Sequence, residues 1–391
     1  MFSKRHIWSL IILMGVGFFL HSFKGTLFND GESKVVYDRD GQLLGASIAS
    51  DGQWRFPERT DVPRKFALAV LQYEDSRYFF HRGIDPIAVA RAIYLNTKHR
   101  SIISGASTIT MQVSRMSRKN RPRTFFQKGI ETAMALFLEL NHSKREILSL
   151  YASNAPFGGN VVGLDAASWR YFNKRPEMLT WAESTTLAVL PNAPGLIHPG
   201  RNRSSLLQKR NELLQRLYYE GIIDSFTLEL SLMEPIPKKP FPLPRKAPHL
   251  MDQLRTDGSQ FKTTIDGMIQ EEVVTISDDY YRQNVQKGIE NHGILVVDNR
   301  TGEVVSYVGN SRGHHQENHV DMVQAKRSSG SILKPFLYAS MMQAGKISPD
   351  QLLPDVPTSI KGFNPKNYNK SYAGAIKAST ALARSLNVPA V

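Results

Sequence analysis

An uninterrupted apolar run near the N-terminus is the strongest hydrophobic feature of the chain. Residues 7–20 carry no charged side chain, and the run as far as Phe23 is about the minimum length of a membrane-spanning helix. Lys4 and Arg5 precede it, which by the positive-inside rule places the N-terminus in the cytoplasm. A cleaved signal peptide is the alternative, but residues 21–25 offer a poor cleavage site. We therefore predict a single-pass anchor over residues 1–24, with the bulk of the chain on the extracytoplasmic side of the inner membrane.

Apolar residues then change from a strand pattern to a helical pattern. Val35 to Tyr37, the turn residues 38–41 and Leu43-Leu44 predict a β-hairpin within residues 25–59. Over residues 60–233, apolar residues recur at helical spacing, as in Phe66, Ala69, Val70 and Tyr73. Helix N-caps are predicted at Asp85, Thr124, Ser143 and Thr180, and a C′ glycine at Gly221. Residues 60–233 are therefore predicted to form one mostly helical domain.

A change in composition marks the end of this domain. Six prolines between residues 235 and 248 predict a stiff linker within a connecting segment, residues 234–289. Residues 293–308 predict two strands around an Asn/Gly turn, and a helix is predicted to begin at Ser331. The third region is predicted to cover residues 290–391. A length of 391 residues is typical of two or three domains.

Charge and cysteine content restrict the chemistry. The formal net charge of +14 favours an anionic partner, either a nucleic acid or a phospholipid surface. The predicted export argues against nucleic acid. The absence of cysteine excludes disulfides and thiolate chemistry.

One long stretch of the chain carries charge of a single sign and lies between two carboxylates. Residues 91–128 contain nine Lys or Arg and no Asp or Glu, with Glu74 before them and Glu131 after them. This pattern predicts a site for a multiply charged anion with acid or base groups beside it. A solvated basic helical face is the alternative.

Ordered motifs in this region resemble those of glycosyltransferase family 51, the peptidoglycan glycosyltransferases. They are Glu74-Asp75 with His81-Arg82-Gly83, then residues 105–112, 128–131 and 144–151, and a looser match at 210–214. The resemblance implies that Glu74 is the general base and that Glu131 is a second catalytic carboxylate near the substrate's pyrophosphate. It leaves open a divalent cation, Mg²⁺ or Mn²⁺, at that pyrophosphate, with no metal site formed by the protein itself. The substrate-binding residues it implies are Asp75, His81, Ser107, Thr108, Thr110, Gln112, Arg115 and Lys128, with Arg118 as a further candidate cation.

The implied partners are lipid II, the growing glycan strand, the inner membrane and, as an open alternative, other cell-wall synthases.

Several positions depart from the family pattern. Tyr78 replaces a Phe, Gln127 replaces an Arg of the third motif, Ser149 replaces a Glu of the fourth, and Ala152-Ser153 replace Leu-Asn. The Gln127 change removes one charge that the resemblance implies for phosphate binding. His81 is evenly balanced between structural support and phosphate contact. The apolar residues at 125–138 favour core packing over contact with lipid tails.

The third region resembles penicillin-binding transpeptidase domains. Ser331-Ile332-Leu333-Lys334 matches the Ser-x-x-Lys motif, with Ser331 as nucleophile and Lys334 as its activator, and Ser385-Leu386-Asn387 matches Ser-x-Asn. The Lys-Thr/Ser-Gly motif does not follow Ser331 in this sequence. We therefore expect a truncated transpeptidase-like domain without useful activity.

Together these resemblances imply an α-rich multidomain protein. A mostly α, lysozyme-like glycosyltransferase domain would precede an incomplete α+β, β-lactamase-like domain. Two other hypotheses remain open, a non-catalytic cell-wall or precursor-binding scaffold and an exported basic protein that binds anionic polymers nonspecifically. A metal cluster at His314, His315 and His319 is a weaker hypothesis than a solvated loop.

Overall fold

The computed structural model describes residues 27–101, 105–120, 124–192, 199–254, 260–312 and 317–391. The chain divides into two compact units, Met1–Val323 and Gln324–Val391. The predicted anchor lies outside the described residues. Within the described ranges, no helix combines the length and apolarity needed to cross a membrane.

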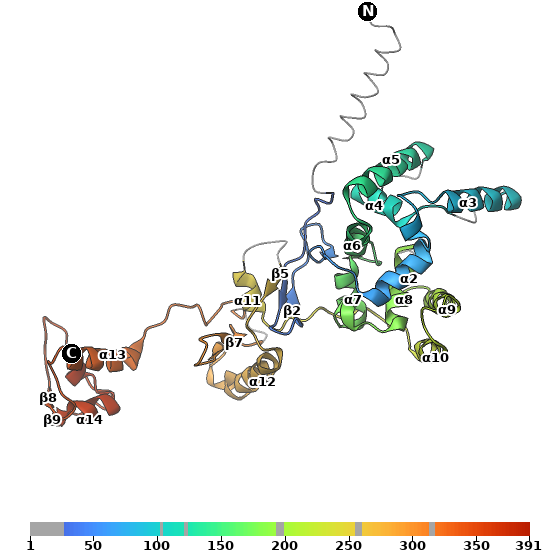
Figure 1. The fold of residues 1–391 in the computed structure, drawn as a ribbon. Helices are drawn as coiled ribbons and strands as arrows, with labels where there is room; N and C mark the ends of the chain where they lie inside the picture. The colour runs from blue at the N-terminus through green and yellow to red at the C-terminus, as the bar shows by residue number, and fades with distance from the viewer. Residues whose placement is uncertain (1–26, 102–104, 121–123, 193–198, 255–259, 313–316) are drawn as a thin grey trace, which may run out of the picture. The chain divides into compact units, whose positions relative to one another are not determined.

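The first unit is mostly helical (Figure 1). Its elements, with η for 3₁₀ turns, are β1 (Val35–Tyr37), β2 (Leu43–Ala46), β3 (Trp54–Arg55), α2 (Arg64–Glu74), η1 (Tyr78–Phe80), α3 (Pro86–His99), α4 (Ile109–Ser117), α5 (Phe125–Asn141), α6 (Lys144–Asn154), β4 (Val161–Val162), α7 (Leu164–Phe172), η2 (Pro176–Met178), α8 (Trp181–Val189), η3 (Leu190–Asn192), α9 (Arg203–Tyr219), α10 (Ser225–Met233), α11 (Pro248–Gln253), β5 (Gln260–Lys262), α12 (Gly267–Asn284), η4 (Val285–Lys287), β6 (Ile294–Val297) and β7 (Val304–Val308).

The predicted helix boundaries agree with the side-chain caps. Asp85 accepts from the backbone N–H groups of Ile87 and Ala88 at the start of α3, and Thr124 accepts from that of Gln127 at the start of α5. Ser143 and Thr180 each form a complete capping box at α6 and α8. These bonds satisfy backbone donors that the first turn of a helix leaves without partners. The predicted caps are confirmed.

One core joins the helices of the first unit. Helix α2 packs against α8 and α9, and α4 packs against α5 and α6. Phe66 and Val70 of α2, Val113 of α4 and Tyr151 of α6 are fully or almost fully buried in the same cluster. In α5 the apolar residues are divided, since Met134 and Leu138 are buried whereas Phe126 is 74% exposed. The predicted preference for core packing therefore holds for part of α5 only.

The predicted hairpin forms, but its sheet has a third strand from far along the chain. β1 pairs antiparallel with β2, with Val35 opposite Ala46, and parallel with β5, with Val35 opposite Gln260. The strand order is β2-β1-β5. The connecting segment thus folds back onto residues that precede the helical domain, which no local sequence pattern indicated.

The Pro-rich segment is bound to the helical domain along its first half. Arg210, which is 1% exposed, donates to the carbonyl of Glu234, and Arg203 donates to those of Ile236 and Pro237. The backbone N–H of Phe241 donates to the carbonyl of Arg170. These bonds hold the first half of the predicted linker on α7 and α9.

The predicted strands near residue 300 form an antiparallel pair, β6 and β7, covered by α12. The second unit contains η5 (Gly330–Leu333), α13 (Lys334–Gln343), β8 (Leu352–Asp355), β9 (Gly374–Lys377), α14 (Ala378–Ala383) and η6 (Val388–Ala390). Its small core surrounds Tyr338 and Ile376. Ser331 lies in a 3₁₀ turn and Lys334 begins the α-helix, close to the predicted start.

Candidate active site

Glu74 is the last residue of α2, and its carboxylate lies against α4. The side-chain amide of Gln112 donates a hydrogen bond of 2.7 Å to Oε2. Oε1 is buried and accepts no hydrogen bond of normal geometry from the described residues. Burial raises the pKa of this carboxyl, while the bond from Gln112 and the charge of Arg115 lower it. A buried carboxylate with one free oxygen and a raised pKa is suited to accept a proton.

Three further residues around Glu74 were not identified from the sequence. Lys209 of α9 lies 3.4 Å from both the Tyr73 hydroxyl and Oδ1 of Asn192, and its charge lowers the pKa of Glu74. The side chain of Asn192 also lowers the pKa of Glu74, through a hydrogen-bonding interaction with the carboxyl. The buried hydroxyl of Tyr151 has its pKa raised by desolvation and by the charge of Glu74. Only packing of α9, η3 and α6 around α2 brings these residues together, so no sequence spacing indicates them.

Asp75 joins the two sides of the first motif inside the protein. Its Oδ1 lies 2.9 Å from Nε2 of His81, and its Oδ2 accepts the backbone N–H of Ile109 at 3.0 Å. Both side chains are buried, each at 8% exposure. This arrangement favours structural support as the role of His81, because the ring is bonded to Asp75 and shielded from solvent. Direct contact of either residue with substrate stays a prediction.

The two threonines predicted to bind substrate also form hydrogen bonds within the protein. Thr108 caps α4 and donates to the carbonyl of Gly83 at 2.6 Å, and Thr110 donates to Glu139 of α5 at 2.6 Å. Gly83 has φ +83°, and a Cβ there would lie 2.9 Å from the carbonyl oxygen of Ala135. The motif glycine therefore allows α5 to approach the loop before α3. These contacts fix α4, which presents Gln112, relative to α5.

The cationic side chains of the site come from α4 and α5. Lys128 donates to the hydroxyl of Ser107, and Arg115 lies close enough to Glu74 to lower its pKa. Arg118 donates to the side-chain carbonyl of Gln127 at 2.7 Å. Gln127, which stands where the family has Arg, thus removes one charge and orients another. Arg115 of α4, Arg118 directly after it and Lys128 of α5 thus lie on neighbouring elements, and an anion site formed by them stays a prediction.

Glu131 lies on α5 and is 7% exposed. Helix α4 contacts α5 and also carries the donor to Glu74, so a single helix adjoins both carboxylate-bearing elements. Within the described part of the chain, no group of three or more His, Asp or Glu is arranged to hold a metal ion. A divalent cation at the pyrophosphate stays a prediction. His314 and His315 of the suggested histidine cluster lie outside the described residues.

The family departures on α6 have a clear structural role. The Ser149 hydroxyl donates to the backbone carbonyl of Arg59 at 2.6 Å, and the Arg59 N–H donates to the Ser153 hydroxyl at 3.0 Å. The Arg59 guanidinium binds Asp165 at 2.7 Å and Glu177 at 2.5 Å. Arg59 thus joins α6 and α7 to the segment that leads into α2.

The second unit brings three predicted residues together. Lys334 donates to Oδ1 of Asn387 at 2.6 Å and to the carbonyl and hydroxyl of Ser385 at 2.7 and 3.4 Å. Desolvation lowers the pKa of Lys334. Ser331 is exposed, and among the described residues no hydrogen bond connects its hydroxyl to Lys334. The lysine is therefore held by the second motif, one turn from the candidate nucleophile.

Comparisons with known proteins agree with these two regions. A transglycosylase family model matches residues 40–218, and a penicillin-binding protein transpeptidase domain model matches residues 292–391. Penicillin-binding protein 1C of Escherichia coli K12 is 36% identical over 92% of this chain and 47% of its own length. Penicillin-binding protein 1F of Bacillus subtilis is 29% identical over 92% of this chain and 52% of its own.

Among solved structures, penicillin-binding protein 1A of Haemophilus influenzae is 18% identical and covers 90% of this chain and 59% of its own, with a TM-score of 0.35. The chain spans about half the length of the sequence relatives named above. The order of the two matched domains and the similarity across most of the chain identify it as a member of the penicillin-binding proteins that carry a transglycosylase domain followed by a transpeptidase domain.

Proposed function

We propose that this chain polymerises lipid II into glycan strands and releases undecaprenyl diphosphate, with Glu74 as the general base. The observation that carries the proposal is the state of the Glu74 carboxylate. Oε2 accepts a hydrogen bond from Gln112 at 2.7 Å, and Oε1 is buried and accepts no hydrogen bond of normal geometry from the described residues, with Asn192 as its nearby polar neighbour. A sugar hydroxyl is a poor nucleophile, and a fixed carboxylate with a free oxygen would take its proton as the hydroxyl attacks the anomeric carbon.

Cations on α4 and α5 supply the second requirement. The leaving pyrophosphate gains negative charge as the glycosidic bond breaks, so preorganised cations stabilise the transition state. Arg115 and Lys128 are the side chains to which we assign this role, with Arg118 oriented by Gln127. We assign Glu131 as the second carboxylate. Two carboxylates with separate roles suit a single displacement that inverts the anomeric centre.

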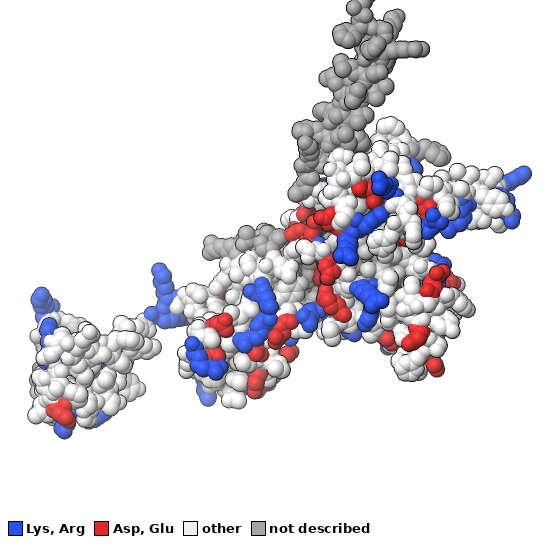
Figure 2. Space-filling model, viewed as in Figure 1, with Lys and Arg blue, Asp and Glu red and all other residues white. Residues whose placement is uncertain are grey.

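Exposed apolar side chains support contact with a lipid surface. Phe80 of η1 is 82% exposed, Ile93 and Tyr94 of α3 are 63% and 64% exposed, and Leu140 of α5 is 77% exposed. In Figure 2, Lys and Arg atoms on the part formed by α3 to α5 lie beside broad uncharged areas. Apolar and cationic groups together are typical of surfaces that contact anionic lipids. We therefore propose that these helices contact the membrane in which the lipid-linked substrate resides.

For the transpeptidase-like region we propose no useful activity in the 391-residue chain when it is tested alone. Lys334, Ser385 and Asn387 are assembled, but a Lys-Thr/Ser-Gly motif does not follow Ser331 in this sequence. In this family the strand that carries the Lys-Thr/Ser-Gly motif contributes to the oxyanion hole. An oxyanion hole accelerates the reaction by about 10²–10³-fold.

Incubation of the purified protein with lipid II tests the main proposal. Chain growth, resolved by gel electrophoresis of labelled glycan, supports a glycosyltransferase. Saturable binding of lipid II without chain growth supports a scaffold that holds the precursor. Binding that other anionic polymers abolish equally well supports a nonspecific basic protein.

A further inference from the structure

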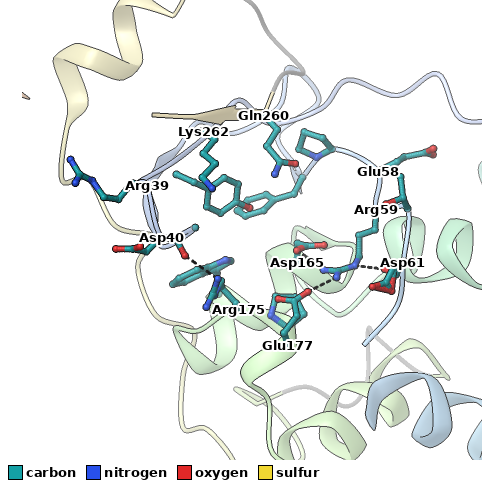
Figure 3. A pocket seen from close by; sticks show the side chains of 17 residues that line it. Arg39, Asp40, Glu58, Arg59, Asp61, Asp165, Arg175, Glu177, Gln260 and Lys262 are labelled. Carbon is teal, nitrogen blue, oxygen red and sulfur yellow. Dashed lines mark hydrogen bonds and ion pairs between the residues drawn. The ribbon is translucent and has the colours of Figure 1, made fainter. Parts of the chain in front are cut away.

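A cavity of about 540 Å³ lies where the β2-β1-β5 sheet meets the helical domain (Figure 3). Its walls come from the β1–β2 turn, residues 56–61, α7, η2 and β5. Of the described residues that line it, none belongs to α2, α4 or α5, which carry the candidate catalytic groups. Its size is within the usual range of small-ligand sites, roughly 300–1,000 Å³.

Charged groups are separated across this cavity. Arg39, Lys262 and Arg175 lie on one side in Figure 3, together with Asp40, whose backbone carbonyl accepts from Arg175. Lys262 projects from β5 toward the interior and forms no ion pair with another described residue. The opposite side is acidic.

The acidic side retains two carboxylates without a cationic partner. Arg59 is already occupied by Asp165 and Glu177. Glu58 accepts only an amide N–H from Asn154, at 3.2 Å, and Asp61 has no side-chain bond among the described residues. A ligand that met both sides would therefore need opposite charges at its two ends.

Two buried donors near the cationic side lack acceptors. Neither Nε1 of Trp169 nor Nε of Arg175 finds a hydrogen-bond acceptor in the described part of the chain, and both atoms are buried. Trp169 is 4% exposed, and both residues line the cavity. A buried donor without a partner is costly, so an acceptor on a ligand that displaced the lining side chains and reached these atoms would gain hydrogen bonds.

Aromatic residues complete the lining. Tyr37, Phe56 and Trp169 offer apolar surface between the charged sides. A polyanion would be repelled by Glu58 and Asp61, and a simple cation by Lys262 and Arg39. An extended tripeptide reaches about 10 Å and carries an ammonium at one end, a carboxylate at the other and apolar atoms between them.

We propose that this cavity binds a short zwitterionic peptide, with its carboxylate toward Lys262 and its ammonium toward the acidic side at Asp61. The site is separate from the glycosyltransferase chemistry and does not depend on it. Arg59 lines the cavity and lies five residues before α2. Its backbone is hydrogen-bonded to the hydroxyls of Ser149 and Ser153 of α6. The bound peptide thus contacts a residue that is tied to the helices around Glu74.

Calorimetric titration of the full chain with three peptides tests the proposal. The probes are trialanine, N-acetyl-trialanine and trialanine amide, so that each cap removes one terminal charge. We expect trialanine to bind at millimolar or lower concentrations and each cap to weaken binding about fivefold, as for a partly exposed ion pair. Glu74→Gln should bind trialanine as the wild type does, which separates this site from the proposed catalytic function.

Charge-matched variants locate each end of the peptide. In Lys262→Gln the effect of amidation should disappear while the effect of acetylation remains, and in Asp61→Asn combined with Glu58→Gln the reverse should hold. Trp169→Phe keeps an aromatic ring and removes one N–H donor. It should weaken the binding of trialanine but leave the difference in affinity between trialanine and trialanine amide. Lys287→Gln, an exposed lysine outside the cavity, should change nothing. The proposal is overturned if trialanine does not bind, if both capped peptides bind as well as trialanine, or if the amidation effect survives in Lys262→Gln. Thermal unfolding of each variant confirms that it is folded.

Discussion

The amide of Gln112 holds the carboxylate of Glu74 at 2.7 Å, across the contact between α4 and the end of α2. Both residues belong to recognisable motifs, but only the fold joins them. The bond holds Oε2 and leaves Oε1 without a hydrogen bond of normal geometry from the described residues. It also favours the ionised form of a buried carboxyl whose pKa is raised by desolvation.

Replacing Glu74 with Gln should abolish chain growth on lipid II. The variant keeps the shape of the side chain and removes the proton acceptor, so we expect a loss of about 10²-fold or more. Glu229→Gln, on the exposed surface of α10, is the matched control and should retain wild-type activity. Near wild-type polymerisation by Glu74→Gln would show that another group takes the proton.

The same variant should be more stable than the wild type at neutral pH. Because burial raises the pKa of Glu74 above its usual 4.5, the folded protein binds this proton more tightly than the unfolded chain does. The stability from protonated Glu74 is fully present below pH 4.5 and is lost as pH rises through the raised pKa. The melting temperatures of wild type and Glu74→Gln should therefore diverge as pH rises from 4.5 through the raised pKa of Glu74. Parallel curves at all pH values would contradict the buried-carboxylate account.

Removing the Gln112 donor should move the pH dependence of activity. In Gln112→Met the ionised form of Glu74 loses its hydrogen bond, so its pKa rises further. The acidic limb of the kcat/KM profile should then shift to higher pH, because the base must be ionised to act. Gln208→Met removes an exposed amide on α9 and should leave the pH dependence of kcat/KM unchanged. An unchanged profile in Gln112→Met would show that the bond does not set the ionisation of the base.

The Arg59 contacts should matter for stability. Arg59→Met leaves Asp165 largely buried without its cation and should lower the free energy of unfolding by about 2–4 kcal/mol. Ser149→Ala should cost about 1 kcal/mol through loss of its bond to the Arg59 carbonyl. Glu177→Gln is the control, because its side chain is 54% exposed and its ion pair should contribute less than about 1 kcal/mol. Chemical denaturation of the three variants measures these differences, and a larger loss in Glu177→Gln than in Arg59→Met would reverse the assignment.

Ser331 should remain unlabelled by β-lactams in the 391-residue chain. Lys334 is positioned by Ser385 and Asn387, but the sequence contains no Lys-Thr/Ser-Gly motif after Ser331 to complete the oxyanion hole. Mass spectrometry after incubation with a fluorescent penicillin measures acylation directly, and Ser331→Ala provides the background. Stoichiometric labelling that Ser331→Ala removes would refute this expectation.

The sequence by itself determined the local elements and named the candidate catalytic residues. Caps at Asp85, Thr124, Ser143 and Thr180 were predictable because each is set by bonds within four residues. The strand pair at residues 294–308 was predictable for the same reason, since its turn is local. Glu74, Gln112 and Lys128 were identified by motif, without any indication of which bonds they form.

Tertiary structure alone decided how these parts meet. The pairing of β1 with β5, more than two hundred residues away, depends on packing that no local pattern encodes. Lys209 reaches the surroundings of Glu74 because α9 packs against α2, and Ser149 meets Arg59 because α6 lies beside the segment before α2. Long-range contacts of this kind are set by complementary burial over whole elements, so individual partners appear only once the chain has folded.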